Sequence, residues 1–279
     1  MPELPEVETV RRGLEVVIIG KQIKDIQIFY PGIIRTPQDS EQFKFLLIGQ
    51  TIEAMGRKGK YLLFHLTDYT LVSHLRMEGK YIYTENPNET FDQHIHVIFS
   101  FTDGTQLRYR DVRKFGTMDV VLKEKVMELE AIKKLGQEVI DPQFDQKRFK
   151  QQVQQRTAPI KQILLNQEIV SGLGNIYVDD SLALSKIHPL RIGKSLTNKE
   201  INTLIAAMKT ILEKAIEKGG STIRTFETFY GRGSMQDHLI VYGRTGKPCL
   251  YCGTPIEKIR VAGRGTHFCP SCQKEPRKK

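Results

Sequence analysis

Met1-Pro2-Glu3-Leu4-Pro5-Glu6 opens the chain, and apolar residues recur at helical spacing: Leu4, Val7, Val10, Leu14 and Val17. This period predicts one helix, from about Pro5 to Ile18, whose single apolar face anchors it to a core. Proline suits a first turn and glutamate suits the positive end of a helix, so an ordinary or loose terminus is the simpler interpretation of six residues alone. If Met1 is removed, as a small second residue favours, the chain begins with the free secondary amine of Pro2.

Short β-rich runs separated by turn residues follow the helix and indicate an antiparallel sandwich. These runs are Ile23–Phe29, Tyr61–Leu66, Leu71–His74, Tyr81–Tyr83, His96–Phe101, Gln106–Tyr109 and Thr117–Val121. Asp103-Gly104 carries a hairpin signal between two of them. A helical run is predicted from Lys123 to Leu135.

Helical periodicity dominates the second half of the chain. The predicted helices are Lys147–Gln155, Pro159–Leu165, Ile176–Ser185 and Lys199–Lys218, the last capped by Thr197 or Asn198. Gly136 and Asp141-Pro142 break the pattern before these helices. We therefore predict an α+β protein, with an N-terminal helix and β-sandwich in residues 1–134, a hinge in 135–144, a helical domain in 145–240 and a small ribbon in 241–279.

Length, charge and hydropathy narrow the class of protein. The 279 residues suffice for two domains, and the net charge of +10 mildly favours a polyanionic partner such as nucleic acid. No apolar run reaches the ~18 residues of a membrane span, and the acidic start lacks the features of a signal peptide. We therefore expect a cytoplasmic protein with no membrane partner.

All four cysteines lie in two close pairs, Cys249-x-x-Cys252 and Cys269-x-x-Cys272, with sixteen residues between the pairs. This spacing predicts a four-thiolate zinc ribbon, and it disfavours disulfides or free thiols in a chain without a secretion signal. Four protein ligands leave no open position for water, so one Zn²⁺ would be structural and would supply the folding energy of this small segment. Between the pairs, residues 261–266 predict a hairpin tip that carries Arg264 outward.

Further turns carry candidate functional side chains: Lys60 in Gly56–Leu62, Met77 in His74–Gly79, Arg113 and Phe115 in Asp111–Gly116, and Asn175 after Gly172-Leu173-Gly174. On the residues alone, solvated basic turns and an ordinary helix cap are at least as good an explanation. Asn175 would begin a helix, however, and the exposed N–H groups of a helix N-terminus bind anions such as phosphate. An apolar wedge beside a guanidinium could also fill the hole that an extruded base leaves in a duplex.

Together and in this order, these segments resemble the bacterial formamidopyrimidine-DNA glycosylases over nearly the whole chain. The resemblance rests on the opening, on Arg57-Lys58-Gly59-Lys60-Tyr61-Leu62, on the helix–two-turn–helix around Asn175 and on the ribbon. It implies base-excision repair of damaged double-stranded DNA, with formamidopyrimidines and 8-oxoguanine as the excised bases. It also implies an enzyme that forms a Schiff base with the sugar and cleaves the abasic strand by β,δ-elimination. We expect a monomer, although the sequence itself does not give the oligomeric state.

The resemblance also implies roles for individual residues. Pro2 would be the nucleophile, Glu3 the proton shuttle at the sugar, and Lys60 and Arg264 the cations of the active site. The implied DNA contacts are His94, Arg113, Lys161, Asn175 and Arg264, and the side chains implied to enter the duplex are Met77, Arg113 and Phe115. Three positions depart from the family pattern, namely Arg76 (often Gly), Asn166 (usually Asp) and Asp180 (usually Glu), and any role carried over to them is weakened.

Several alternatives remain open at this stage. Endonuclease VIII, a relative that prefers oxidised pyrimidines, normally has glycine where this chain has Leu4. The loop Ser221–Asp237, with Phe226, Phe229 and Tyr230, resembles the glycosylase loop that covers a flipped purine, although a mobile surface loop is a fair competitor. A non-catalytic zinc-ribbon protein leaves the proline terminus unexplained, and a metal-dependent nuclease requires clustered acidic ligands, of which the sequence offers no persuasive set.

Overall fold

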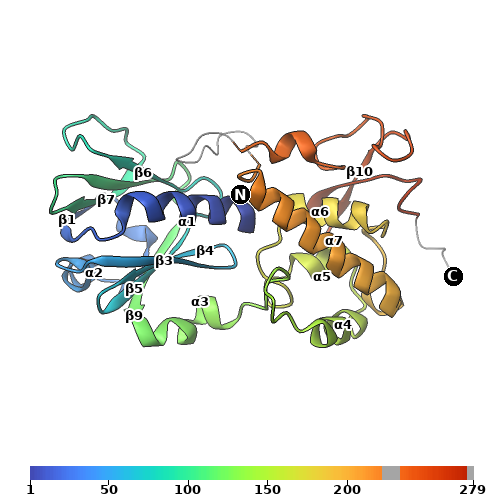
Figure 1. Ribbon diagram of the computed structural model, residues 1–279, viewed down its shortest axis with the longest axis horizontal. Helices are drawn as coiled ribbons and strands as arrows, with labels where there is room; N and C mark the ends of the chain where they lie inside the picture. Colours follow the sequence, from blue (N-terminus) through green and yellow to red (C-terminus); the bar gives the residue numbers. More distant parts are fainter. Residues whose placement is uncertain (222–232, 275–279) are drawn as a thin grey trace. The chain divides into compact units, whose positions relative to one another are not determined.

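The computed structural model describes residues 1–221 and 233–274, in two compact units (Figure 1). Met1–Lys133 form the first unit, and Lys134–Ser221 together with the chain from Ser234 onward form the second. Phe226, Phe229 and Tyr230, the aromatic residues of the predicted lesion-covering loop, lie outside the described residues. Among the described helices, none combines the length and the apolar character needed to cross a membrane.

The first unit contains two sheets, as the sequence predicted. The five-stranded sheet has the order β2-β9-β5-β4-β3, with bounds Ile34–Thr36, Thr117–Leu122, Tyr69–His74, Tyr61–Leu66 and Ile52–Lys58. The four-stranded sheet has the order β1-β7-β8-β6, with bounds Ile23–Ile28, Ile95–Phe101, Gln106–Arg110 and Lys80–Thr84. The predicted Asp103-Gly104 turn joins β7 to β8, and apolar residues of both sheets share one core.

Helix α1 (Leu4–Ile18) runs beside the two sheets in Figure 1 and packs on β3 and β4. Its apolar face is buried from Leu4 to Ile18, as the helical period predicted. A capping box closes its N-terminus: the Glu3 side chain accepts from the backbone N–H of Glu6, and the backbone N–H of Glu3 donates to Glu6 Oε2 over 2.9 Å. Since both carboxylates are buried, the first turn of the helix is held within the protein.

Parts of the first unit differ from the sequence prediction. Helix α2 (Ser40–Leu47) and strands β2 and β3 were not predicted, and β2 pairs with β9 in parallel, so the sandwich is not wholly antiparallel. The continuous helix predicted for Lys123–Leu135 is wrong. The segment forms a 3₁₀ helix, η2 (Lys123–Glu128), and a short α3 (Glu130–Lys133), because Leu129 between them has an extended ψ of 122° that ends the first element.

Helices form most of the second unit, within one or two residues of their predicted bounds. They are α4 (Gln146–Gln154), α5 (Ile160–Leu165), α6 (Asn175–Leu184) and α7 (Asn198–Glu217). The described part of this unit also has the short 3₁₀ helices η3 (Gly193–Ser195) and η4 (Met235–His238), and η1 (Pro31–Ile33) lies in the first unit. Thr197 caps α7 through a capping box with Glu200. Strands β10 (Glu257–Val261) and β11 (Arg264–Phe268) form the predicted antiparallel hairpin, so residues 262–263 make its tip.

A buried carboxylate joins helix α6 to the segment that leads into the ribbon. Asp180 accepts hydrogen bonds from the backbone N–H groups of Ile240, Val241 and Tyr242, at 2.8, 3.1 and 3.1 Å. Burial raises the pKa of Asp180 to about 6, although the three N–H donors favour its ionised form. The aspartate that departs from the family pattern therefore has a clear structural role.

We expect Asp180→Asn to destabilise the second unit by about 2 kcal/mol, because one carboxylate oxygen becomes an NH₂ group that faces N–H donors. Hydrogen exchange should locate this loss at the amides of residues 240–242. Asp145→Asn is the matched control, because Asp145 is an exposed cap of α4 and asparagine caps equally well. Equal protection of residues 240–242 in both variants would contradict the role of Asp180.

Candidate functional site

The beginning of the chain lies in a largely buried part of the first unit, among charged side chains. Pro2 is buried and Glu3 is only 2% exposed. Burial is the main cause that lowers the pKa of the α-amino group of Met1, the residue before Pro2. The carboxylates Glu3, Glu6 and Glu78 oppose this effect, and the Lys60 ammonium adds to it. Lys60 and Glu3 thus lie within electrostatic range of the Met1 amine, which loses its proton more readily than a solvated one, and their roles in catalysis stay predictions.

Lys60 lies in the two-residue turn between β3 and β4, where Lys58 pairs with Tyr61. Gly59 takes a φ of +57°, a conformation that glycine adopts without the strain of a side chain. Lys60 itself is only 4% exposed, so its stem is buried beside the start of α1. A tight hairpin turn leaves little freedom to the backbone, and burial of the Lys60 side chain limits the positions open to its ammonium.

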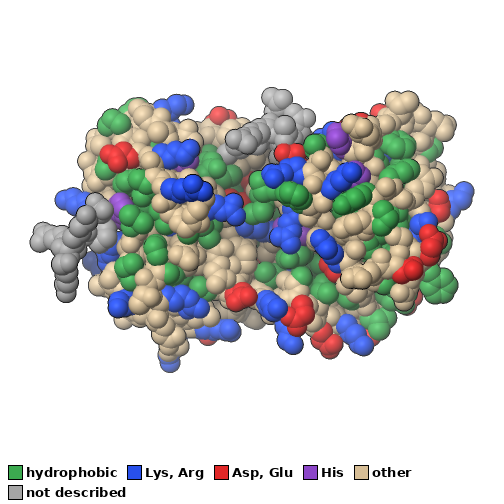
Figure 2. Space-filling model, turned by 180° about the vertical axis from the view of Figure 1, so that it is seen from behind, with side chains coloured by type: hydrophobic (Ala, Val, Ile, Leu, Met, Phe, Trp, Pro, Cys, Tyr) green, Lys and Arg blue, Asp and Glu red, His purple; other side chains and the backbone are tan. Residues whose placement is uncertain are grey.

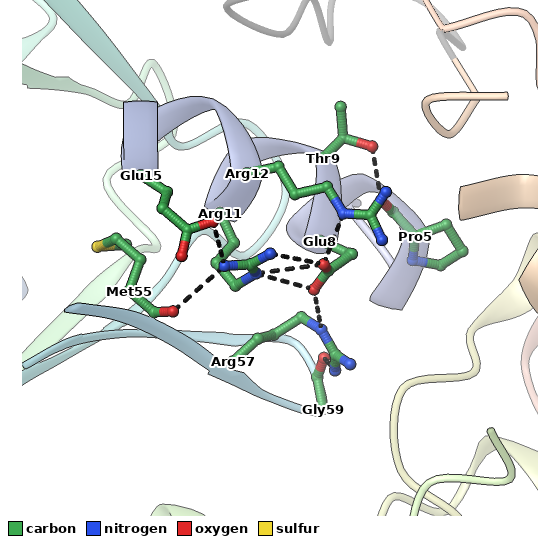
Figure 3. A network of polar contacts seen from close by, with 9 residues as sticks. All are labelled: Pro5, Glu8, Thr9, Arg11, Arg12, Glu15, Met55, Arg57 and Gly59. Carbon is green, nitrogen blue, oxygen red and sulfur yellow. Dashed lines mark hydrogen bonds and ion pairs between the residues drawn. The ribbon is translucent and has the colours of Figure 1, made fainter. Parts of the chain in front are cut away.

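A cluster of arginines around Glu8 connects α1 to this turn (Figure 3). The Glu8 carboxylate accepts hydrogen bonds from Arg11, Arg12 and Arg57, at 3.0, 2.9 and 3.1 Å. Burial alone would raise the pKa of Glu8, but these hydrogen bonds outweigh it and lower the pKa. Arg57 also donates to the carbonyl of Gly59 at 2.9 Å, so α1 and the Lys60 turn are fixed to each other.

The sequence prediction did not include Glu8 and Arg57 in the site. The helical spacing of Glu8 to Arg11 and Arg12 was a visible signal of an ion pair, but such pairs are common on solvated helix faces. The contact between Glu8 and Arg57 joins residues 49 positions apart. Only the packing of α1 on β3 brings these two side chains together.

Two loops of the first unit present the side chains predicted to enter DNA. Phe115 is 49% exposed, and the Arg113 guanidinium lies 4.6 Å from the centre of its ring, so these two form a stacked pair. Met77 is half-buried in the loop after β5. His94 is half-buried just before β7, and its backbone N–H donates to Asp92 at 2.9 Å.

His74 closes strand β5 beside these residues. Burial, together with the cations Arg76 and Lys60, lowers the pKa of His74 to about 3, so its imidazole is neutral at physiological pH. Its Nδ1 accepts the backbone N–H of Arg76 at 2.9 Å, which requires the other ring nitrogen to carry the hydrogen. This contact holds Arg76 at a φ of +51° at the start of the Met77 loop.

In the second unit, Lys161 and Asn175 converge on the ribbon hairpin. Lys161 Nζ donates to the carbonyl of Gly265 at 3.1 Å, and Asn175 Nδ2 donates to the same carbonyl at 2.9 Å. Arg264, the residue before it, is exposed at the hairpin tip. Asn175 begins α6 as predicted, and its buried Oδ1 has no hydrogen-bond partner within the described residues.

Lys161 lies deeper than the sequence prediction implied. Its side chain is fully buried, and its ammonium forms an ion pair with Asp179 over 2.7 Å. The other oxygen of Asp179 accepts the backbone N–H of His267 at 2.8 Å. Lys161 and Asp179 thus fasten β11 to α6, and Asp179 is a residue that sequence reasoning missed, because adjacent acidic residues usually lie on a solvated helix face.

The four cysteines lie together, with all their sulfur atoms within 4.8 Å of one another. Cys249 and Cys272 are separated by 4.0 Å between sulfurs, and Cys252 and Cys269 by 3.5 Å. A tetrahedral Zn²⁺ with bonds of about 2.3 Å places its sulfur ligands roughly 3.8 Å apart, so these residues fit the ion. The cluster supports the prediction of one structural zinc held by four thiolates.

Three segments of the chain match known domain families in chain order. Residues 1–118 match the formamidopyrimidine-DNA glycosylase N-terminal domain, residues 135–227 the H2TH domain of the same enzymes, and residues 246–274 the zinc finger found in FPG and IleRS. The formamidopyrimidine-DNA glycosylase of Streptococcus pneumoniae is 51% identical over 277 residues, which cover 98% of this chain and 99% of that protein. The chain belongs to the formamidopyrimidine-DNA glycosylase family.

Other glycosylases agree in sequence and fold. The formamidopyrimidine-DNA glycosylase of Listeria innocua is 50% identical over 276 residues, covering 98% of this chain and all of that protein. A crystal structure of a Lactococcus lactis FPG mutant with Fapy-dG-containing DNA has a TM-score of 0.93 and 46% identity, over 98% of this chain and 100% of that chain. MutM in complex with DNA containing carbocyclic 8-oxo-G has a TM-score of 0.92 at the same identity and coverage.

Cys269→Ser should remove the zinc and unfold the ribbon while the first unit stays folded, because metal binding supplies about 10–16 kcal/mol to sites of this kind. Metal analysis by atomic emission and circular dichroism would measure these two effects, and affinity for damaged duplex should fall more than about tenfold. Ser271→Ala, between the same two cysteines, is the matched control. Retained zinc and unchanged DNA affinity in Cys269→Ser would contradict the assignment.

Proposed function

We propose that this protein excises formamidopyrimidines and 8-oxoguanine from duplex DNA and then cleaves the resulting abasic strand. The observation that carries the proposal is the buried start of the chain, where Glu3 and Lys60 adjoin the terminal amine in a member of this glycosylase family. Relatives of the same fold were crystallised with DNA containing Fapy-dG, carbocyclic 8-oxo-G and an abasic site. We infer that it acts in the cytoplasm on the bacterial chromosome.

The chemistry begins with a neutral amine. After Met1 is removed, the secondary amine of Pro2 attacks C1′ of the damaged nucleotide, and the bond to the base breaks with protonation of the leaving base. The amine nitrogen, now bonded to C1′, loses its proton, and the C1′–O4′ bond breaks with protonation of O4′, which opens the sugar and gives an iminium. This iminium has no N–H to lose, so it stays cationic and acidifies the C2′–H bond. Loss of that proton expels the 3′ phosphate, a second elimination expels the 5′ phosphate, and hydrolysis frees the amine.

Two side chains serve this sequence of steps. Glu3, adjacent to the nucleophile, exchanges protons with the opened sugar. Lys60 lowers the pKa of the α-amino group of Met1, one residue away, and we expect the same ammonium to favour the unprotonated form of the Pro2 amine and to pair with a phosphate of the damaged strand. The buried capping box between Glu3 and Glu6 supports these roles, because it fixes the chain direction next to Pro2.

DNA binding is assigned to both units. In the first unit, Arg113 and His94 contact the DNA, while Met77, Arg113 and Phe115 fill the space left by the extruded base. In the second unit, Asn175 at the start of α6 and Arg264 at the hairpin tip hold phosphates, with Lys161 setting the position of the hairpin. Lys and Arg side chains are spread over the visible face of each unit, and the net charge is +10 (Figure 2).

The zinc has no chemical role in this proposal. Cys249, Cys252, Cys269 and Cys272 would all be ligands, which leaves no position for water or substrate. The ion would instead fix the hairpin that carries Arg264. We further propose that the enzyme acts as a monomer on damaged duplex DNA, the kind of DNA with which its relatives were crystallised.

Blocking the terminus tests the nucleophile. Protein carrying one extra residue before Pro2, verified by mass spectrometry, should lose base excision, strand cleavage and covalent trapping by borohydride, because the Pro2 nitrogen is then an amide whose lone pair is delocalised. The control is protein with Pro2 exposed, on duplexes that carry 8-oxoguanine, a formamidopyrimidine or thymine glycol. Full activity in the blocked sample would place the nucleophile elsewhere, and faster excision of thymine glycol would favour endonuclease VIII specificity.

The pH profile tests the role of Lys60. Excision should increase with pH as the amine loses its proton, and Lys60→Met should move the midpoint of this increase to higher pH, because a cation that lowers the amine pKa is gone. Single-turnover trapping rates across pH measure the midpoint. Lys60→Arg, which keeps the charge, should retain the wild-type midpoint. An unchanged midpoint in Lys60→Met would show that Lys60 does not lower the pKa of the nucleophilic amine.

A further inference from the structure

A buried pair of residues at the end of β8 connects three loops of the first unit. Tyr109 and Asp111 are both fully buried, so neither side chain lies on the surface of the unit. The loops that meet on them carry the side chains proposed to enter or contact DNA. They are residues 74–79 with Met77, residues 94–96 with His94, and residues 111–116 with Arg113 and Phe115.

Asp111 shapes the loop that carries the stacked Arg113 and Phe115. Its Oδ1 accepts the backbone N–H of Arg113 at 3.0 Å. Its Oδ2 accepts the backbone N–H groups of Phe115 and Gly116, at 2.9 and 2.8 Å. These three donors close the loop around one buried carboxylate. The Phe115 side chain projects outward from the closed loop and is 49% exposed.

The backbone of Asp111 also holds the His94 segment. The N–H of Asp111 donates to the carbonyl of His94 at 3.0 Å. His96 Nε2 donates to the carbonyl of Asp111 at 2.8 Å, so the ring, which is 2% exposed, carries its hydrogen on that nitrogen. The side chain and the backbone of one residue therefore set the positions of two loops.

Tyr109 contacts the third loop, which carries Met77. Its hydroxyl lies 3.5 Å from Asp111 Oδ2. Two glycines approach this hydroxyl so closely that a Cβ on either would clash with it. A Cβ on Gly116 would lie 1.7 Å from the Tyr109 hydroxyl oxygen, and one on Gly79 would lie 2.3 Å from it. Gly79 belongs to the Met77 loop and Gly116 to the Phe115 loop, so both loops rest on one hydroxyl group.

We propose that Tyr109 and Asp111 are positioning residues for base extrusion, because they hold Met77, Arg113 and Phe115 in the arrangement that replaces the extruded base in the duplex. This inference rests on the proposed function. Extrusion of a stacked, paired base costs a few kcal/mol, which a correctly placed wedge offsets. An abasic site has no base to extrude, so the lyase step there depends much less on the wedge.

The test compares the two reactions in one variant. In Asp111→Asn an NH₂ group replaces one of the two acceptor oxygens, and it would face backbone donors in the Phe115 loop. Under single-turnover conditions, excision of 8-oxoguanine should fall at least about tenfold, whereas cleavage of a preformed abasic site should fall less than about threefold. A fluorescent 2-aminopurine next to the lesion should show slower unstacking in the variant.

Asp103→Asn is the matched control, since Asp103 makes the turn at the opposite end of the β7–β8 hairpin and is exposed. It should retain both activities within about twofold. Tyr109→Phe removes only the hydroxyl. If Asp111→Asn melts at a temperature well below that of the wild type, Tyr109→Phe is the variant that tests the positioning role. It should show the same selective loss to a smaller extent.

The outcomes separate the inference from the proposed function. Equal losses on the lesion and the abasic site, or no loss on either in Asp111→Asn or Tyr109→Phe, would overturn the positioning role while the wild-type enzyme remains active. Absence of both excision and abasic cleavage in the wild-type protein would overturn the proposed function itself.

Discussion

The fixed start of helix α1 is the constraint on which the rest of the first unit depends. A terminal amine at the end of a free chain would sample many positions, but here the capping box and the Glu8 cluster hold the first turn against β3. Removing either Glu8 or Arg57, whose side chains are largely shielded from solvent, would leave the other charge unpaired, so the cluster resists local opening. Because Arg57 binds both Glu8 and the Gly59 carbonyl, the same contacts hold the Lys60 turn.

In the second unit, too, buried carboxylates fix neighbouring segments, and here they belong to two adjacent residues of the buried helix α6. Asp179 binds Lys161 and the backbone of β11, and Asp180 binds three backbone N–H groups of residues 240–242. A buried carboxylate is costly unless hydrogen bonds or a cation compensate for lost water, and here both do. The ribbon hairpin is therefore held by α6 at one end and by its four-cysteine cluster at the other.

Both units share a design in which buried polar groups position exposed side chains. In the first unit, Asp111 and Tyr109 are hidden while Phe115 and Arg113 are exposed, and in the second, Lys161 is hidden while Arg264 is exposed. Hydrogen bonds to ionised groups are stronger and more directional than apolar contacts, so they fix loops that carry little core of their own. An exposed functional side chain can then be replaced without loss of the loop that presents it.

The sequence by itself determined the α1 helix, most strands and helices, the cysteine cluster and the family, because these depend on periodicity and spacing along the chain. Only the tertiary structure decided that β2 pairs in parallel and that Lys161 is buried against Asp179. It alone brought Arg57 to Glu8, across 49 positions, and the Tyr109 hydroxyl to Gly79. Such contacts follow from how elements pack on one another, and no local pattern of residues records that packing.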